Sequence, residues 1–417
     1  MNAEKKVFLN TFYQMAGKMI TSFLGVINFG FLARYLGPVR MGEYNLILSF
    51  VGFLFVFADF GLGTILTREV AGKKADKDYI DFVFSLRFLL TLAMAVFSSF
   101  LIFFFNYSTD VKLGVIIFAF GNIAYMLSQI IWSIFQAKMQ FGKIVVTQVF
   151  ISVISCLLVL TSVLLKMPLL FFICIASFTI IISFIITLKL YGENLRFLFN
   201  LLYFKKIAKE SWSLGVGAVV SVIYFKIDSL IIPLFYNPSI HADLGYYSTA
   251  YKIFEVAMVF GGFYTQTLFP LFSANLHTAN FRKHFFRFFV YTVLLALAGN
   301  ISLLLFAKIF ITILGGSKYL PAVTSLQILS FAVSSCILSG FFLDIGIAAG
   351  KQLVLVKCAI AASIINIILN ILVIPKYSYI GASWTTVVTQ YFILISYAVV
   401  AFYVIRRLNK QKKELII

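Results

Sequence analysis

The sequence predicts an all-α polytopic membrane protein with twelve transmembrane helices, arranged as two six-helix bundles. Composition gives the first indication. Of the 417 residues, 62% are hydrophobic and 12% are charged, and the mean hydropathy is +1.01. A soluble domain carries about 25% charged residues. An apolar excess of this size cannot be buried in one globular core, so we expect most of the chain to lie in lipid.

Apolar stretches of about 20 residues recur along the whole chain, and each is long enough to cross a ~30 Å hydrocarbon core as a helix. A β-barrel would instead show alternating segments of about 10 residues. The first stretch follows Lys5 and Lys6 as a signal peptide would, but it is too long and no cleavage site follows it. The twelve stretches lie near residues 8–33, 43–66, 80–105, 112–135, 144–165, 169–189, 211–235, 248–272, 287–310, 320–346, 352–374 and 380–405.

The basic residues predict the orientation of these helices. Of the 34 Lys and Arg, 23 fall in segments on the same side as the N-terminus, 7 fall on the other side and four lie inside helices. Loops rich in Lys and Arg stay in the cytoplasm. We therefore expect a multi-pass protein of the bacterial plasma (inner) membrane with both termini cytoplasmic. The asymmetry also explains much of the +19 net charge without a nucleic-acid partner.

The longest segment outside the membrane divides the chain into two halves. We expect residues 1–189 to form the first six-helix bundle and residues 211–405 the second. Between them, residues 190–210 form a cytoplasmic linker, as an interfacial amphipathic helix or as a plain connection. Residues 406–417 form a basic cytoplasmic tail. A Pro followed by Gly-x-Tyr occurs after the first helix of each half, which favours a parallel repeat.

Several classes of function lack the residues that they need. The largest segment outside the membrane has about 20 residues, and no nucleotide-binding Gly-x-x-x-x-Gly-Lys-[Ser/Thr] loop occurs. We therefore predict that the chain is not an enzyme and has no catalytic residues. The four Cys lie in predicted helices and the three His in loops, without ligand spacing, so we expect no metal site.

Charged residues at membrane depth are costly and are candidates for function. Lys18 lies near the middle of the first helix, where its ammonium cannot easily reach the membrane surface, so we expect it to face a cavity. Asp59 and Arg87 lie at matched depth on consecutive helices. We favour an ion pair between them that fixes helix packing, over a role in ligand binding.

The stretch "YFKIDSLII" at 224–232 places Lys226 and Asp228 inside an apolar run. Residues at i and i+2 point about 200° apart on a helix, so these two cannot neutralise each other. The next helix carries Lys252 and Glu255, one turn apart at similar depth. We expect Asp228 to pair with Lys252, which leaves Lys226 directed into a central space.

With these residues in view, the chain resembles the polysaccharide (O-antigen type) lipid-linked oligosaccharide flippases. They belong to the superfamily that includes the multidrug and toxin extrusion (MATE) transporters. The resemblance covers essentially the full length. It rests on "ARYLGPVRMGEY" (33–44), "ADFGLGTILTREVAG" (58–72), "YFKIDSLII", "LFPLFS" (268–273) and "NIILNILVIPKYSYIGASWTT" (366–386).

The resemblance implies a MATE-like fold with a central cavity that opens alternately to either side. The implied cargo is an undecaprenyl-diphosphate-linked oligosaccharide, moved to the outer leaflet for O-antigen, lipopolysaccharide or capsule-type polysaccharide biosynthesis. Lys18, Lys226 and Lys252 match the cationic cavity lining of the family. Gln266 adds a hydrogen-bonding group for sugars, and Asp228 and Glu255 are candidates for a structural role or for carrying a coupling charge.

The same resemblance suggests partners for the protein, and several alternative functions remain open. No cofactor is expected beyond a coupling proton or sodium ion, and a polymerase and chain-length proteins of the same pathway are candidate partners. The alternatives are a cation-coupled multidrug exporter, a flippase for the peptidoglycan lipid precursor, and a membrane polysaccharide polymerase. An exporter of cationic drugs favours acidic cavity residues, whereas lysines match or outnumber carboxylates here.

Overall fold

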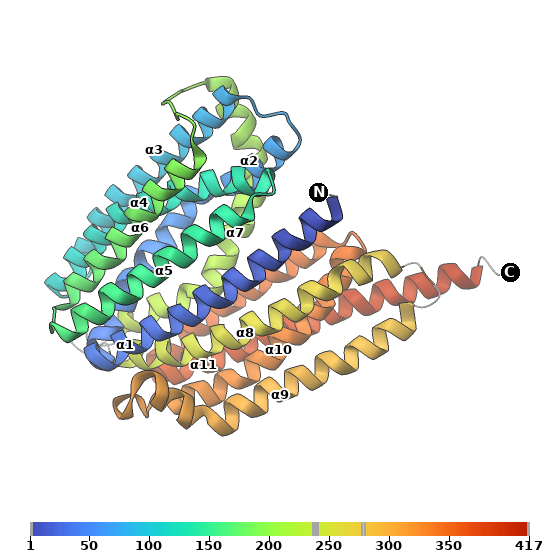
Figure 1. The fold of residues 1–417 in the computed structure, drawn as a ribbon. Coiled ribbons are helices and arrows are strands. Elements are labelled where there is room, and N and C mark those ends of the chain that lie inside the picture. The colour runs from blue at the N-terminus through green and yellow to red at the C-terminus, as the bar shows by residue number, and fades with distance from the viewer. Residues whose placement is uncertain (1–2, 236–241, 277, 279–280, 415–417) are drawn as a thin grey trace. The chain divides into compact units, whose positions relative to one another are not determined.

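The computed structural model describes residues 3–235, 242–276, 278 and 281–414, and within these ranges the chain is helical and contains no strand (Figure 1). Two 3₁₀ segments, Ile102–Phe104 and Ser317–Tyr319, also lie among the described residues. The helices are α1 (Ala3–Asp59), α2 (Leu62–Ala71), α3 (Lys77–Leu101), α4 (Thr109–Ala137), α5 (Phe141–Leu164), α6 (Leu169–Tyr191), α7 (Leu201–Phe235), α8 (Ala242–Asn275), α9 (Phe281–Gly315), α10 (Ala322–Ala348) and α11 (Gln352–Glu414).

Two of these helices are each made of two segments joined at a kink. In α1 the kink lies at Gly37, whose φ of 70° is readily adopted by glycine, and Pro38 follows it. In α11 the kink lies at Ser378, with φ of 47°. When both kinks are counted as breaks, the described residues contain twelve long helical segments and the short α2. The predicted all-α fold class is confirmed.

The length and composition of these helices suit a membrane. Among the described residues, eight helices are long and apolar enough to span one, and two of these, Phe12–Asp59 and Gln352–Arg407, contain the kinks and have room for two crossings. Helices α7 and α8, with 35 and 34 residues, are each about 50 Å long at 1.5 Å per residue. The chain is a multi-pass membrane protein.

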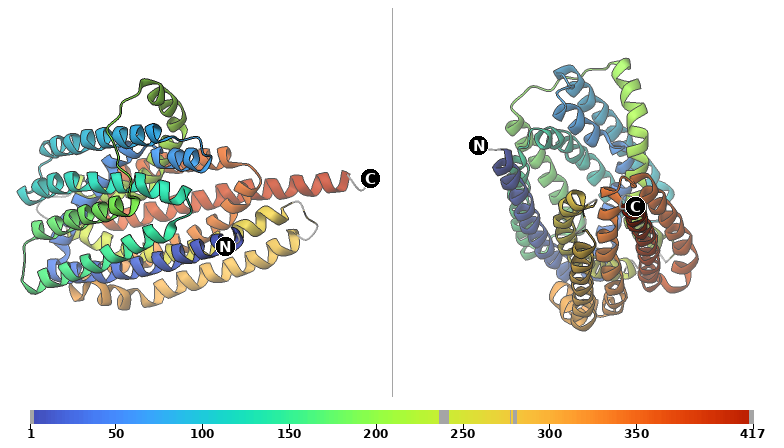
Figure 2. Two further views of the ribbon diagram at one scale, coloured as in Figure 1. Left: turned by 45° about the horizontal axis from the view of Figure 1, so that its top comes forward. Right: turned by 90° about the vertical axis from the view of Figure 1, so that its right-hand side faces the viewer.

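The chain forms two compact units. The first contains Met1–Val222 and Asn237–Gly245, and the second contains Ile223–Tyr236 and Tyr246–Ile417. In the first unit α4 packs against α3 and α6, and α1 against α5; in the second, α10 packs against both α9 and α11 (Figures 1 and 2). Helix α7 belongs to both units, since its residues 201–222 lie in the first unit and its remainder in the second.

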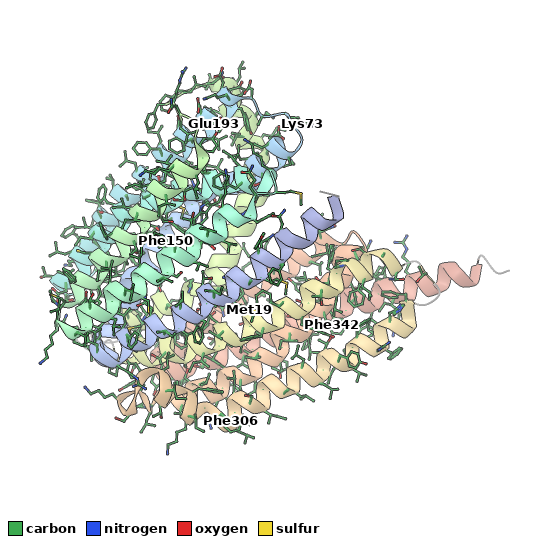
Figure 3. All side chains as sticks on the ribbon, viewed as in Figure 1. Met19, Lys73, Phe150, Glu193, Phe306 and Phe342 are labelled. Carbon is green, nitrogen blue, oxygen red and sulfur yellow. The ribbon has the colours of Figure 1, made fainter. Side chains whose placement is uncertain are left out.

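Large apolar side chains cover much of the outside of both units. Phe150 on α5 and Phe306 on α9, labelled in Figure 3, are 52% and 48% exposed. A soluble monomer rarely exposes large contiguous apolar patches, because water penalises them. In a bilayer these side chains contact lipid at no such cost.

Two predicted boundaries differ in the structure. The expected span 43–66 is interrupted, because its helix ends at Asp59 and the left-handed backbone of Phe60 (φ 39°) and Gly61 (φ 80°) separates it from α2. The linker does not form a helix of its own. Its last residues, 201–210, are the first turns of α7, which continues without a break to Phe235.

Candidate functional site

The clearest cluster of charges at membrane depth lies in the second unit and joins α7 to α8. Glu255 lies between two lysines, with Oε1 3.4 Å from the Lys226 Nζ and Oε2 3.3 Å from the Lys252 Nζ. The Lys226 ammonium also lies 5.9 Å from the centre of the Tyr251 ring. All three charged side chains are partly exposed, at 44%, 38% and 29% for Lys226, Glu255 and Lys252. The cluster has a net positive charge.

Asp228, two residues along α7 from Lys226, lies in a separate polar network. Its Oδ2 accepts hydrogen bonds from the hydroxyls of Tyr247 and, at 3.2 Å, Thr386. The side chain is only 2% exposed, and its buried Oδ1 has no hydrogen-bond partner among the described residues. The expected pair with Lys252 is therefore wrong. Asp228 points toward α11, while Lys252 bonds to Glu255.

A chain of uncharged polar groups continues from this point between the two segments of α11. The Asn366 amide donates to Thr389 Oγ1 at 3.1 Å, and the Asn370 amide donates to Asn366 Oδ1 at 3.0 Å. Thr385, next to Thr386, donates to Asn370 Oδ1 at 2.6 Å. All of these side chains are buried. These bonds join the two segments of α11 by helix–helix hydrogen bonding.

Lys18 lies on α1 in the first unit and is exposed. Its neighbour Gly17 allows α5 to approach closely, since a Cβ at this position would lie 2.5 Å from Val145 Cγ1. In the described part of the chain the ammonium of Lys18 makes no hydrogen bond or ion pair. The side chain of Gln266, the remaining predicted site residue, lies outside the described residues.

Asp59 and Arg87 are brought together at the break between α1 and α2. Arg87 Nη2 lies 2.6 Å from Asp59 Oδ1, and the arginine side chain is completely buried. Arg87 also donates to the Ala58 carbonyl at 2.8 Å and to Gln129 Oε1 at 3.0 Å. A cation at the C-terminal end of a helix stabilises carbonyls that have lost their helical partners. The ion pair therefore stabilises the C-terminal end of α1 and also joins α1 to α3.

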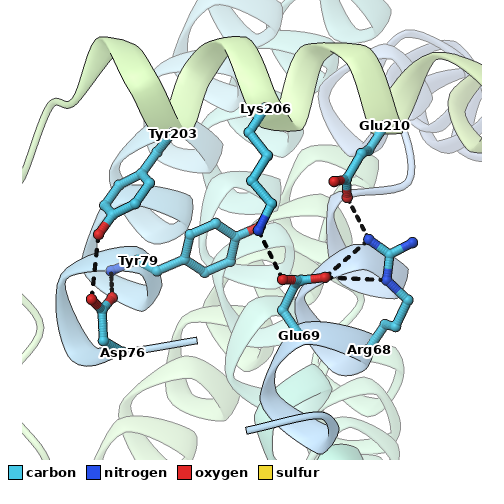
Figure 4. Close-up of polar contacts among 7 residues, drawn as sticks. All are labelled: Arg68, Glu69, Asp76, Tyr79, Tyr203, Lys206 and Glu210. Carbon is cyan, nitrogen blue, oxygen red and sulfur yellow. Dashed lines mark hydrogen bonds and ion pairs between the residues drawn. The ribbon is translucent and has the colours of Figure 1, made fainter. Parts of the chain in front are cut away.

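A second charged network was not predicted, and it fastens the first turns of α7 to the α2–α3 region of the same unit (Figure 4). Lys206 donates to Glu69 Oε2 at 2.9 Å, and Arg68 bonds to Glu69 Oε1 at 3.0 Å and to Glu210. Five residues after Glu210, Gly215 lets α7 pack against the ring of Phe60.

The same face of α7 extends this network to the start of α3. The Tyr203 hydroxyl donates to Asp76 Oδ2 at 3.3 Å, while Asp76 Oδ1 caps α3 by accepting from the Tyr79 backbone N–H at 2.8 Å. Positions 203, 206 and 210 recur at helical spacing, and this spacing was the feature of the sequence that could have predicted their shared helix face. The sequence could not indicate that they face α2 and α3, because over 120 residues separate Asp76 from Tyr203.

Comparison with known proteins identifies the family. Residues 7–276 match the model of the polysaccharide biosynthesis protein family. The chain belongs to this family. It is also 24% identical over 374 residues to the capsular polysaccharide biosynthesis protein CapF of Staphylococcus aureus, covering 86% of this chain and 90% of that one.

Solved structures show the same fold at low sequence identity. The lipid II flippase MurJ, in an inward closed conformation, gives a TM-score of 0.78 at 15% identity, covering 95% of this chain and 91% of that one. An inward-facing multidrug resistance MATE family transporter of the MOP superfamily gives 0.69 at 12% identity, covering 94% and 96%. This polysaccharide biosynthesis protein therefore has a MATE-like transporter fold, and its structural neighbours are transporters and not enzymes.

The Glu69 network should make the stability of this polysaccharide biosynthesis protein depend on pH. The hydrogen bond from Lys206, with a further one from Arg68, lowers the pKa of Glu69 below its usual 4.5. The unfolded chain therefore binds more protons in this range, so the stabilisation is complete above pH 4.5 and is lost as pH falls through the folded pKa. We expect Glu69→Gln to lose less thermal stability than the wild type on acidification below pH 4.5.

Thermal unfolding of the purified protein in detergent, measured from pH 7 to pH 3.5, tests this expectation. Glu193→Gln is the matched control, since its carboxylate is 46% exposed and forms only long contacts, at 3.8 Å with Lys138 and at 3.5 Å with the Tyr191 hydroxyl. Parallel curves for wild type and Glu69→Gln would contradict the assignment.

Proposed function

We propose that this protein is a flippase that moves an undecaprenyl-diphosphate-linked oligosaccharide repeat unit from the cytoplasmic to the outer leaflet of the bacterial plasma membrane. Alternating access of a MATE-like fold would carry the headgroup across, with both termini in the cytoplasm. The product would serve capsule-type or O-antigen polysaccharide biosynthesis. Similarity to a capsular polysaccharide biosynthesis protein supports the first of these more directly.

The observation that carries the proposal is the pair of partly exposed lysines, Lys226 and Lys252, inside helices of a polysaccharide biosynthesis protein. A diphosphate cannot cross a ~30 Å layer of low dielectric constant without compensating charge. Ammonium groups at membrane depth supply that charge, while the prenyl chain stays in lipid. A transporter of organic cations would place carboxylates there in excess.

Lys18 would supply a further cation from the first unit. It is exposed on α1, and the described residues give its ammonium no protein anion to bind. Asp228 would have a different task, because it is buried and surrounded by hydroxyl groups. We assign it to the coupling of transport to a proton or a sodium ion.

Substitution of both lysines tests the proposal in a strain whose own gene is deleted. Complementation with Lys226→Ala/Lys252→Ala should reduce surface polysaccharide at least tenfold at normal protein abundance, because the diphosphate loses its compensating charge. Lys308→Ala on α9 is the control, since Lys308 is an exposed helix lysine outside the cluster. Single repeat units on undecaprenyl diphosphate should accumulate, and an added sugar-modifying enzyme should reach them only from the cytoplasmic face.

Other positions of the intermediate would identify a different function. Single units exposed on the outer face would indicate a defect in polymerisation. Trapped peptidoglycan precursor would indicate the activity named for MurJ. Normal intermediates together with raised drug sensitivity would indicate a multidrug exporter.

A further inference from the structure

Glu255 lies between Lys226 and Lys252, where a bound anion would also contact both ammonium groups. Each carboxylate oxygen contacts a different ammonium group, at 3.4 and 3.3 Å. One lysine comes from α7, and the other lies one turn before Glu255 on α8. This is the arrangement in which two cations would bind two oxygens of a phosphate group, with a protein carboxylate in its place.

The contacts of this carboxylate are suited to exchange. Strong charge-assisted hydrogen bonds between ammonium and carboxylate groups measure about 2.7–2.9 Å, and both contacts here are longer. All three side chains are partly exposed, so surrounding atoms do not enclose the carboxylate. Asp228 differs in its surroundings, because it is buried and its Oδ2 accepts hydrogen bonds from two hydroxyl groups.

We propose that Glu255 is an internal counter-ion that the substrate diphosphate displaces on binding and that reclaims the two lysines on release. The inference rests on the flippase function proposed above and assigns a regulatory residue to the same site. A diphosphate carries more negative charge than one carboxylate, so it can replace Glu255 at both ammonium groups. The returning carboxylate then competes with the product and speeds its departure.

A counter-ion role predicts that removing the Glu255 charge has opposite effects on the affinity for anions and on the rate of transport. Without the Glu255 charge the two lysines are unpaired, so anions should bind more tightly. The same change should slow release. A carboxylate with only a structural role in joining α7 and α8 would give the opposite result, since its loss would disorder the lysines and weaken binding.

The closing experiment measures binding of inorganic pyrophosphate to the full-length protein in nanodiscs by calorimetry, free of divalent cations. We expect Glu255→Gln to bind at least tenfold more tightly than wild type, and to support slower transport of the lipid-linked substrate. Glu255→Asp retains the charge on a shorter side chain that cannot reach both lysines, and should give intermediate affinity. Glu193→Gln, which removes an exposed carboxylate of the first unit, should bind as wild type does.

The results distinguish this inference from the proposed function. If Glu255→Gln binds pyrophosphate no more tightly than wild type, while Lys226→Ala/Lys252→Ala abolishes binding, the counter-ion role is overturned and the diphosphate site remains. If pyrophosphate binding does not depend on the two lysines in any variant, the counter-ion role and the diphosphate site at the lysines are both overturned. If Glu255→Gln is not folded, Glu255→Asp decides the matter, because an affinity equal to or below that of wild type contradicts displacement.

Discussion

Replacing Asp59 by alanine should destabilise the protein by about 3–5 kcal/mol, the cost of leaving a buried charge without its partner. The remaining charge would be Arg87, whose side chain is completely buried and lies 2.6 Å from the Asp59 carboxylate. Its bonds to the Ala58 carbonyl and to Gln129 are neutral and cannot replace an anion. The end of the helix at Phe60 and Gly61 would lose its anchor at the same time.

Thermal and denaturant unfolding in a mild detergent, followed by size-exclusion chromatography, provides the measurement. Asp110→Ala is the matched control. Its partner Arg40 lies 2.8 Å away, but the two side chains are 39% and 49% exposed, so we expect a loss of about 0–1 kcal/mol. Equal stability of the two variants would show that Arg87 does not depend on Asp59.

The sequence was sufficient for the fold class because lipid imposes a simple rule. Backbone polar groups must be satisfied within the segment, so every long apolar stretch has to be helical. The break at Phe60–Gly61 was missed for the same reason: "ADFGLGTIL" is almost as apolar as the helix around it. Hydropathy indicates whether a residue favours lipid or water, and it carries no information on backbone angles.

The partners of the intramembrane charges were only partly predictable. Depth along a helix follows from 1.5 Å per residue, and it placed Asp59 at the level of Arg87. It also placed Lys252 and Glu255 at a depth similar to that of Lys226 and Asp228, but it did not predict the contact between Lys226 and Glu255. The direction of a side chain around the helix axis depends on packing between helices. Asp228 therefore bonds to Thr386, a residue 158 positions later, while Lys252 at similar depth bonds to Glu255.

Replacing Asp228 by asparagine should abolish ion-driven transport while the protein remains folded. The Asn carbonyl oxygen can still accept hydrogen bonds from Tyr247 and Thr386, so the contacts of Oδ2 are retained. What disappears is the negative charge and the buried Oδ1, which has no hydrogen-bond partner among the described residues. A proton or a sodium ion would bind at that charge, because an ionisable residue within a membrane is by default a candidate for such a role.

Reconstituted vesicles loaded with lipid-linked substrate make the test specific. We expect wild type to move the substrate at least tenfold faster under an imposed proton or sodium gradient than without one, and Asp228→Asn to show the same slow rate in both conditions. Asp110→Asn removes an exposed carboxylate and should retain the stimulation. If Asp228→Asn still responds to the gradient, the coupling charge lies elsewhere, and Asp228 serves only to fasten α7 to α8 and α11. Because the lysine cluster is intact in this variant, its slow, gradient-independent rate would also separate coupling from recognition of the diphosphate.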